Sequence, residues 1–212
     1  MNLWDRLDDV ARRHDVLRHP FYVGWSEGRL SRTDLALYAG QYRHAVRALA
    51  EASTAAASSP EAGPDANALA THAAEERDHI GLWDDFVLAV GGRVDAEPTE
   101  ETRKCVAAWA GDRGRPLLET LSATYAIESA QPAIARTKRE GLVRHYGITE
   151  TSYFSLHEQL DVEHAAYARD LISRRLAGAE QEERLVGATE RALQANWTLL
   201  DGVERLIAAD AS

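Results

Sequence analysis

Hydrophobic residues recur at helical spacing along nearly the whole chain. In the first segment, about residues 2–16, Leu3, Leu7 and Val10 form one apolar stripe, as an amphipathic helix requires. A short aromatic helix from Phe21 to Trp25 follows. No segment shows the alternation of apolar and polar residues that marks a half-buried strand. The pattern therefore predicts an all-α protein.

Capping and breaking residues divide this pattern into separate helices. Ser31 and Asp34 have capping-box spacing at the start of a helix that reaches about residue 57. The next predicted helix covers about residues 65–90 and ends at Gly91-Gly92. The others are expected over about 99–110, 116–146, 149–176 and 181–208. With no internal repeat, we expect a single domain over residues 1–212, a bundle of about seven helices.

Composition and charge exclude several classes of protein. The chain has 212 residues, of which 45% are hydrophobic, so it can bury a sizeable core. Its net charge of −10 disfavours nucleic-acid and anionic-membrane partners. No apolar run approaches the ~18 residues of a membrane span, and no export signal is visible at the start. The single cysteine, Cys105, fits a reducing compartment, where we expect it to be a buried structural thiol. These features predict a cytoplasmic protein.

The clearest chemical motif is H-x3-D-x2-H, formed by His157, Asp161 and His164. These positions share one face of a predicted helix. A solvated face is the alternative, but Phe154 and Leu171 lie on the same side, so the face is expected to point inward. A buried aspartate is costly unless it is paired or binds a cation. Two imidazoles and a carboxylate suit a transition metal, iron above all.

A second cluster of histidines and acids lies upstream. Glu76 and His79 form E-x-x-H, the pair that carboxylate-bridged di-iron bundles use. His72 and Glu75 precede His79 by seven and four residues, so either could also reach the same point. The spacing leaves open which of His72, Glu75 and Glu76 binds a metal. The alternative for the acids here is a solvated run of charge.

Glu128 is an isolated acid in an apolar stretch, and it is either a metal ligand or part of a salt bridge. As a ligand it would be a carboxylate bridging two irons. Aromatic residues are expected to shape a dry pocket beside the metals, and His44 is a further candidate for that pocket. The predicted pocket residues are Tyr42, His44, Trp83, Tyr125 and Phe154.

Together these residues resemble the heme-oxygenase-like superfamily, which includes thiaminase II, pyrroloquinoline-quinone synthase and the heme-oxygenase-like di-iron oxidases. The resemblance covers nearly the whole chain and includes His19-Pro20-Phe21-Tyr22 near the start, the stretch from His79 to Trp83, and Pro132, Lys138 and Gly141. The position of Cys105, outside the metal-bearing helices, disfavours thiaminase chemistry.

The di-iron branch of this superfamily is marked by E-x6-H, a central glutamate and H-x3-D-x2-H. His79, Glu128, His157, Asp161 and His164 match these motifs position by position. The departure is His72, which stands where the family has its first glutamate. Either His72 replaces that carboxylate, or Glu75 or Glu76 takes over from a neighbouring turn. The predicted ligand set is His72, Glu76, His79, Glu128, His157, Asp161 and His164.

The resemblance implies an O2-dependent non-heme di-iron oxygenase with two irons per chain, although manganese would suit the same donors. We expect a small polar substrate and, first, N-oxygenation of an amine. Oxidative cleavage of a carbon–carbon bond in an amino or fatty acid is an alternative. A homodimer is compatible with the sequence, since many such bundles associate.

Two further alternatives remain. In the 4-aminobenzoate-synthase type, which resembles this chain in compactness, the protein consumes its own tyrosine and takes an amino group from a lysine. Tyr22 and Lys138 stand at positions that such residues could occupy, although a core aromatic and a charge near a helix end are the simpler interpretation. The other alternative is a non-enzymatic helical binding or regulatory protein that keeps a metal site without oxygen chemistry.

Overall fold

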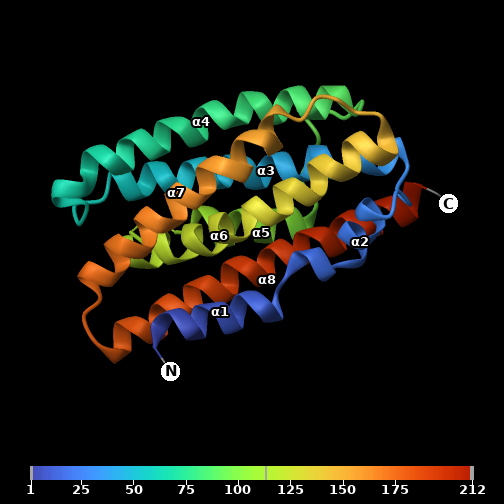
Figure 1. Cartoon of the computed structure of the whole chain (residues 1–212). Coiled ribbons are helices and arrows are strands. Elements are labelled where there is room, and N and C mark those ends of the chain that lie inside the picture. Colours follow the sequence, from blue (N-terminus) through green and yellow to red (C-terminus); the bar gives the residue numbers. More distant parts are fainter. Residues whose placement is uncertain (1, 113, 211–212) are drawn as a thin grey trace.

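The computed structural model describes residues 2–112 and 114–210, and this part of the chain contains eight α-helices and no strand (Figure 1). The helices are α1 (Leu3–Arg13), α2 (Pro20–Ser26), α3 (Arg32–Ala57), α4 (Ala66–Ala89), α5 (Glu100–Ala110), α6 (Leu117–Gly141), α7 (Ser152–Arg175) and α8 (Ala179–Asp210). Single turns of 3-10 helix lie at Val16–Arg18 and Gly63–Asp65. The all-α prediction is confirmed, and the helix boundaries fall close to the predicted ones.

The helix starts follow local capping chemistry. The Ser31 side chain accepts a hydrogen bond from the Asp34 N–H, and Asp34 accepts one from the Ser31 N–H, which confirms the predicted capping box. Thr99 caps α5 in the same way, by accepting from the Thr102 N–H. These caps satisfy backbone donors that the first turn of a helix leaves unpaired.

The predicted helix over residues 116–146 is regular only as far as Gly141 and continues as a π-helical turn, Leu142–Tyr146. Gly141 lies directly against α2. A Cβ atom at position 141 would stand 2.6 Å from Cδ1 of Trp25, so a larger residue does not fit. The Trp25 indole donates a hydrogen bond to the Lys138 carbonyl at 3.0 Å, which holds α2 against the end of α6.

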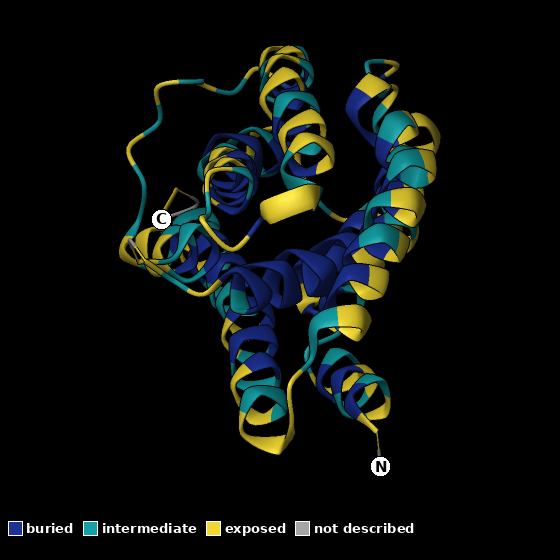
Figure 2. Ribbon diagram, turned by 90° about the vertical axis from the view of Figure 1, so that its left-hand side faces the viewer, coloured by how far each residue is buried: buried dark blue, intermediate teal, exposed yellow. Residues whose placement is uncertain are grey.

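The helices pack so that their apolar faces meet in the interior (Figure 2). α6 packs along α7, α3 along α4, and α8 along both α5 and α6, with α1 covering α8. α4 contacts α7 much less than it contacts α3. The interior between α4, α6 and α7 is where the predicted metal-binding residues project.

Two predictions from composition can be compared with the structure. No helix in the described residues is long and apolar enough to cross a bilayer. Cys105 is fully buried in the main hydrophobic cluster, and burial raises the pKa of its thiol. This environment is that of a structural thiol, because reactive cysteines have lowered pKa values.

Candidate metal centre

The predicted metal-binding residues come from three helices and converge on one interior region. α4 contributes His72, Glu76 and His79, α6 contributes Glu128, and α7 contributes His157, Asp161 and His164. Ten buried side-chain nitrogen and oxygen atoms of the described residues make no hydrogen bond, and nine of the ten belong to these residues. Buried polar atoms in folded proteins are nearly always hydrogen-bonded. A cluster of unpaired donors of these types fits a bound transition metal.

The ligand atoms form two groups, each with its atoms within 4.8 Å of one another. The first group contains His72, Glu76, Glu128 and His164, and the second contains Glu76, His79 and His157. Glu76 belongs to both groups because the residues at i−4 and i+3 lie on either side of it along α4. The sequence suggested Glu128 as the bridging carboxylate, whereas in the structure the carboxylate common to both groups is that of Glu76.

Distances within the two groups show how closely these atoms approach. His72 Nε2 lies 3.0 Å from Glu128 Oε1 and 3.8 Å from Glu76 Oε1, while His79 Nδ1 lies 3.1 Å from Glu76 Oε1. The atoms face one another without the geometry of hydrogen bonds. The structure therefore brings both His72 and Glu76 to the site, two of the three residues among which the sequence did not choose.

Glu75, the third candidate, lies outside this cluster. Its side chain is 40% exposed, and its Oε2 lies 3.0 Å from His164 Nε2. The other ring nitrogen of His164, Nδ1, is buried, unbonded, and 3.7 Å from Asp161 Oδ1. Glu75 thus orients the His164 ring from the solvent side, as carboxylates behind metal-binding histidines commonly do.

The ring orientation of His157 is fixed in a similar way. Its Nδ1 donates to the Tyr153 carbonyl at 2.7 Å. A carbonyl can only accept, so Nδ1 carries the proton and Nε2 presents its lone pair to the interior. The imidazole is buried, and burial lowers its pKa to about 4. His157 is therefore neutral at physiological pH, the form that binds a metal.

The acids of the site are strongly perturbed by burial and by one another. Asp161 is 1% exposed, neither of its oxygens is hydrogen-bonded, and burial raises its pKa to about 7. For His72, burial alone would lower the pKa, but the carboxylates of Glu128 and Glu76 outweigh this effect and raise the pKa to about 10. Burial would raise the pKa of Glu76, but His72 and His79 lower it overall. The buried carboxylates of the site thus stabilise positively charged groups beside them.

Lys138 lies in a cage of aromatic rings that come from α2, α3, α4 and α7. The sequence favoured a charge near a helix end, but the structure buries Lys138 to 1% exposure. Its Nζ lies 4.6 to 5.7 Å from the ring centres of Tyr22, Tyr38, Tyr42, Trp83 and Phe154. No carboxylate of the described residues pairs with it, and burial lowers the pKa of the amine well below its usual value.

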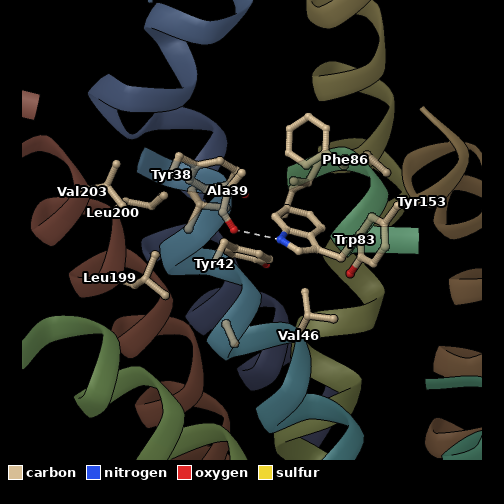
Figure 3. Close-up of a cluster of buried hydrophobic side chains, with 14 of the residues drawn as sticks. Tyr38, Ala39, Tyr42, Val46, Trp83, Phe86, Tyr153, Leu199, Leu200 and Val203 are labelled. Atoms are coloured by element: carbon tan, nitrogen blue, oxygen red, sulfur yellow. Dashed lines mark hydrogen bonds between the residues drawn. The ribbon is translucent and has the colours of Figure 1, made fainter. Parts of the chain in front are cut away.

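Three rings of the cage, those of Tyr38, Tyr42 and Trp83, pack against one another in the hydrophobic core (Figure 3). The Trp83 indole donates to the Ala39 carbonyl at 2.9 Å, as the dashed line in Figure 3 shows. The Tyr22 and Tyr38 hydroxyls share a hydrogen bond of 2.8 Å. The Tyr153 ring stacks on His157 at 3.9 Å and contacts Trp83 at 4.7 Å between centroids. Tyr153 therefore connects the cage to the metal cluster.

The predicted pocket residues divide between different places. Tyr42, Trp83 and Phe154 surround Lys138. Tyr125 instead lines a groove between α6 and α7 that reaches Asp161. His44 is apart from both, because its Nε2 lies 2.8 Å from the Ala96 carbonyl oxygen.

Sequence reasoning overlooked Tyr38 and Tyr153. Tyr153 precedes His157 by four residues, so the spacing alone could have placed it beside that ligand.

Comparison with known proteins places the chain in a family. The sequence model of a family described as "Iron-containing redox enzyme" matches residues 36–197, and the chain belongs to that family. The chain is accordingly an iron-containing redox enzyme with the heme-oxygenase-like fold that its motifs resemble.

Named relatives match almost the entire chain. A 4-aminobenzoate synthase from Chlamydia trachomatis is 31% identical, covering 95% of this chain and 91% of the relative. The 4-aminobenzoate synthase of Nitrosomonas europaea is 30% identical, covering 93% and 89%. A heme-oxygenase-like structure from Shewanella denitrificans superposes with a TM-score of 0.81 at 17% identity, covering 100% of this chain and 96% of that one. A TenA homologue from P. horikoshii has a TM-score of 0.80 at 16% identity, covering 97% and 99%.

Proposed function

We propose that this iron-containing enzyme forms a 4-aminobenzoate-type aromatic amine from its own Tyr22, with Lys138 as the source of nitrogen. The observation that carries the proposal is the buried amine of Lys138, 5.0 Å from the Tyr22 ring centre, in a chain whose relatives are named 4-aminobenzoate synthase. Six of the seven predicted ligands make up the two groups and would hold two irons, with Glu76 common to both groups and the seventh, Asp161, beside His164.

The substitution pattern of the product supports Tyr22 as its precursor. 4-Aminobenzoate carries nitrogen and a carboxyl carbon at opposite positions of the ring, and tyrosine carries oxygen and Cβ at the same positions. Conversion requires that the Cα–Cβ bond breaks, that Cβ is oxidised to a carboxylate, and that nitrogen replaces the phenolic oxygen, which leaves as water. In the nitrogen transfer the Cε–Nζ bond of Lys138 breaks, and Cε is oxidised to an aldehyde whose oxygen comes from water. O2 is the oxidant, and bound iron would supply the activation of O2 and the electron transfers that these oxidations need.

Lys138 is prepared for the nitrogen transfer by its surroundings. An amine is nucleophilic only when neutral, and burial lowers the pKa of Lys138 well below its usual value. The rings around it exclude water, which would otherwise compete for reactive species.

Tyr22 is also held in place. It is 1% exposed, and its hydroxyl is fixed by the hydrogen bond with Tyr38. Burial raises the pKa of Tyr22, so its ring enters the reaction as a neutral phenol. Such positioning of two reactants avoids the entropic cost of bringing them together.

An isotope experiment can identify the nitrogen donor, because Lys104 and Lys138 are the only lysines of the chain. Protein containing ring-13C tyrosine and side-chain 15N lysine would be loaded anaerobically with ferrous iron, then exposed to O2 and a reductant. We expect mass spectrometry to find a released aromatic amine with six 13C atoms and one 15N atom. The peptide containing Tyr22 should lose the mass of a tyrosine side chain.

Substitutions assign the two donors. Tyr22→Phe and Lys138→Arg should each abolish the labelled product. Tyr167→Phe and Lys104→Arg are matched controls, since Tyr167 lies on the outer part of α7 and Lys104 is 60% exposed in an ion pair with Glu100. An unlabelled product, or full product from Lys138→Arg, would refute the proposal. N-oxygenation of an added amine would instead leave Tyr22 intact.

A further inference from the structure

A cavity of about 280 Å³ lies between the end of α1, α6 and α8. Its walls are mostly apolar and include Val16, Ile127, Ile134 and Leu193. None of the seven predicted metal ligands is among its lining residues, so it is separate from the metal cluster. Since an apolar cavity of about 150 Å³ accommodates benzene, this one has room for a ring with two polar substituents.

Two carboxamides are placed in these apolar walls. Gln131 and Asn196 both line the cavity and are 3% and 4% exposed. The Asn196 Oδ1 is the one buried unpaired atom of the described residues that lies outside the metal cluster. An unsatisfied buried acceptor is costly, and a ligand with an N–H or O–H donor would satisfy it.

The outer end of the cavity is charged. Arg12 and His14 line it with side chains 70% and 20% exposed, and Asp15 lies beside them. The Asp15 carboxylate is already engaged, because its Oδ1 accepts from the Leu17 N–H. Arg12 is ion-paired with Asp9, and His14 Nε2 lies 3.8 Å from Glu190 Oε1, so an anionic group at the mouth would compete with these acids for the two basic side chains.

The inner end of the cavity meets the aromatic cage. Tyr42 lines the cavity, and the centre of its ring lies 4.6 Å from Lys138 Nζ. Tyr42 therefore separates the proposed reaction site from a cavity that leads outward. A product formed beside Lys138 would need to pass only this ring to reach the cavity.

We infer that the cavity is a release site that binds a monocyclic aromatic amine carrying a carboxylate. The apolar walls bury the ring, Asn196 accepts a hydrogen bond from the amine, and Arg12 and His14 face the carboxylate. The inference rests on the proposed function for the identity of the ligand, but binding at this cavity is measurable whether or not the chain makes that ligand.

The test is calorimetric titration of the metal-free full-length protein with 4-aminobenzoate. We expect saturable binding at one site. Asn196→Leu should weaken the affinity at least tenfold, and Ala133→Trp, which places a ring at an exposed lining position, should remove binding. Gln194→Leu changes an exposed amide on the same helix and should bind like the parent protein. Benzoate should bind several-fold more weakly because it offers Asn196 no donor.

Absence of saturable binding, or equal affinity in the parent, Asn196→Leu and Ala133→Trp proteins, would overturn the inference. If Asn196→Leu fails to fold, Ala133→Trp decides the result, since residue 133 is exposed. Labelled product without binding here would refute the release site alone, whereas binding without labelled product would refute the proposed function alone.

Discussion

The metal cluster and the Lys138 cage share α4, α6 and α7, although the cage also takes rings from α2 and α3, and the two regions have different chemistry. α4 contributes Glu76 to the cluster and Trp83 to the cage, and α7 contributes His157 and Phe154 in the same way. Glu128 and Lys138, both on α6, are ten residues apart, or roughly 15 Å along the axis. One region collects carboxylates and imidazoles, and the other surrounds a cation-forming group with rings.

The difference shows how one bundle can hold two buried charged groups by different means. In the cluster, carboxylates and histidines compensate one another, and several stay unpaired unless a cation binds. In the cage no carboxylate of the described residues pairs with the amine, and burial lowers its pKa well below the usual value. The first region therefore favours a bound cation, and the second favours the neutral form of the amine.

The largest effect is expected at Glu76, the ligand common to both groups. Glu76→Ala should remove both irons, whereas Glu128→Ala and His157→Ala should each remove about one. Metal counting after anaerobic iron loading measures this directly. Asp78→Ala, at an exposed position of α4, is the control and should bind like the parent. Loss of a single iron in Glu76→Ala would show that the carboxylate does not bridge.

The next largest effect is expected in the cage. Lys138→Met should raise the free energy of unfolding, because burial disfavours the charged form of the lysine and a methionine carries no such cost. Between the lowered pKa of the folded state and 10.4, the usual lysine pKa, the folded state binds fewer protons than the unfolded state, so the stability of the parent rises with pH.

The gain from Lys138→Met should therefore shrink by about 1.4 kcal/mol per pH unit as pH approaches 10.4. Urea unfolding at several pH values measures it, with the exposed Lys104→Met as the neutral control. A gain that does not change with pH across this range would show that Lys138 stays protonated in the folded protein.

A smaller effect is expected at Glu75, which contacts the predicted ligand His164 but belongs to neither ligand group. Glu75→Ala should weaken iron binding at the His164 side about tenfold without removing it, as loss of an outer partner of a metal-binding histidine does. Competition with a chelator gives the dissociation constant. If Glu75→Ala instead lost iron as completely as Glu76→Ala, Glu75 would be a ligand itself.

The smallest effect is expected within the cage. Tyr38→Phe removes the hydroxyl that pairs with Tyr22, and should lower the free energy of unfolding by about 1 kcal/mol with iron content unchanged. Equilibrium denaturation and metal counting on the same sample test both parts. A loss of iron would mean that the cage also supports the cluster.

Several parts of the structure were predictable because they depend on neighbours in the chain. Ser31 and Asp34 predicted a helix start, and the spacing of His157, Asp161 and His164 placed three donors on one face. The close packing at Gly141 was not predictable, because the residue that leaves no room for a side chain there is Trp25, far away in sequence. The burial of Lys138 was not predicted for the same reason, because it depends on distant segments. The rarity of lysine in this arginine-rich chain was nevertheless a signal that Lys138 has a special role.

The sequence by itself determined the helices and the chemical identity of the donors, since periodicity, caps and i, i+3, i+4 spacing act within one helix. Only the tertiary structure decided that Glu76 rather than Glu128 is common to both ligand groups and that Lys138 lies beside Tyr22. Those relations depend on how far each helix is rotated and shifted against its neighbours. That is set by the packing of side chains from distant segments, which no local pattern contains.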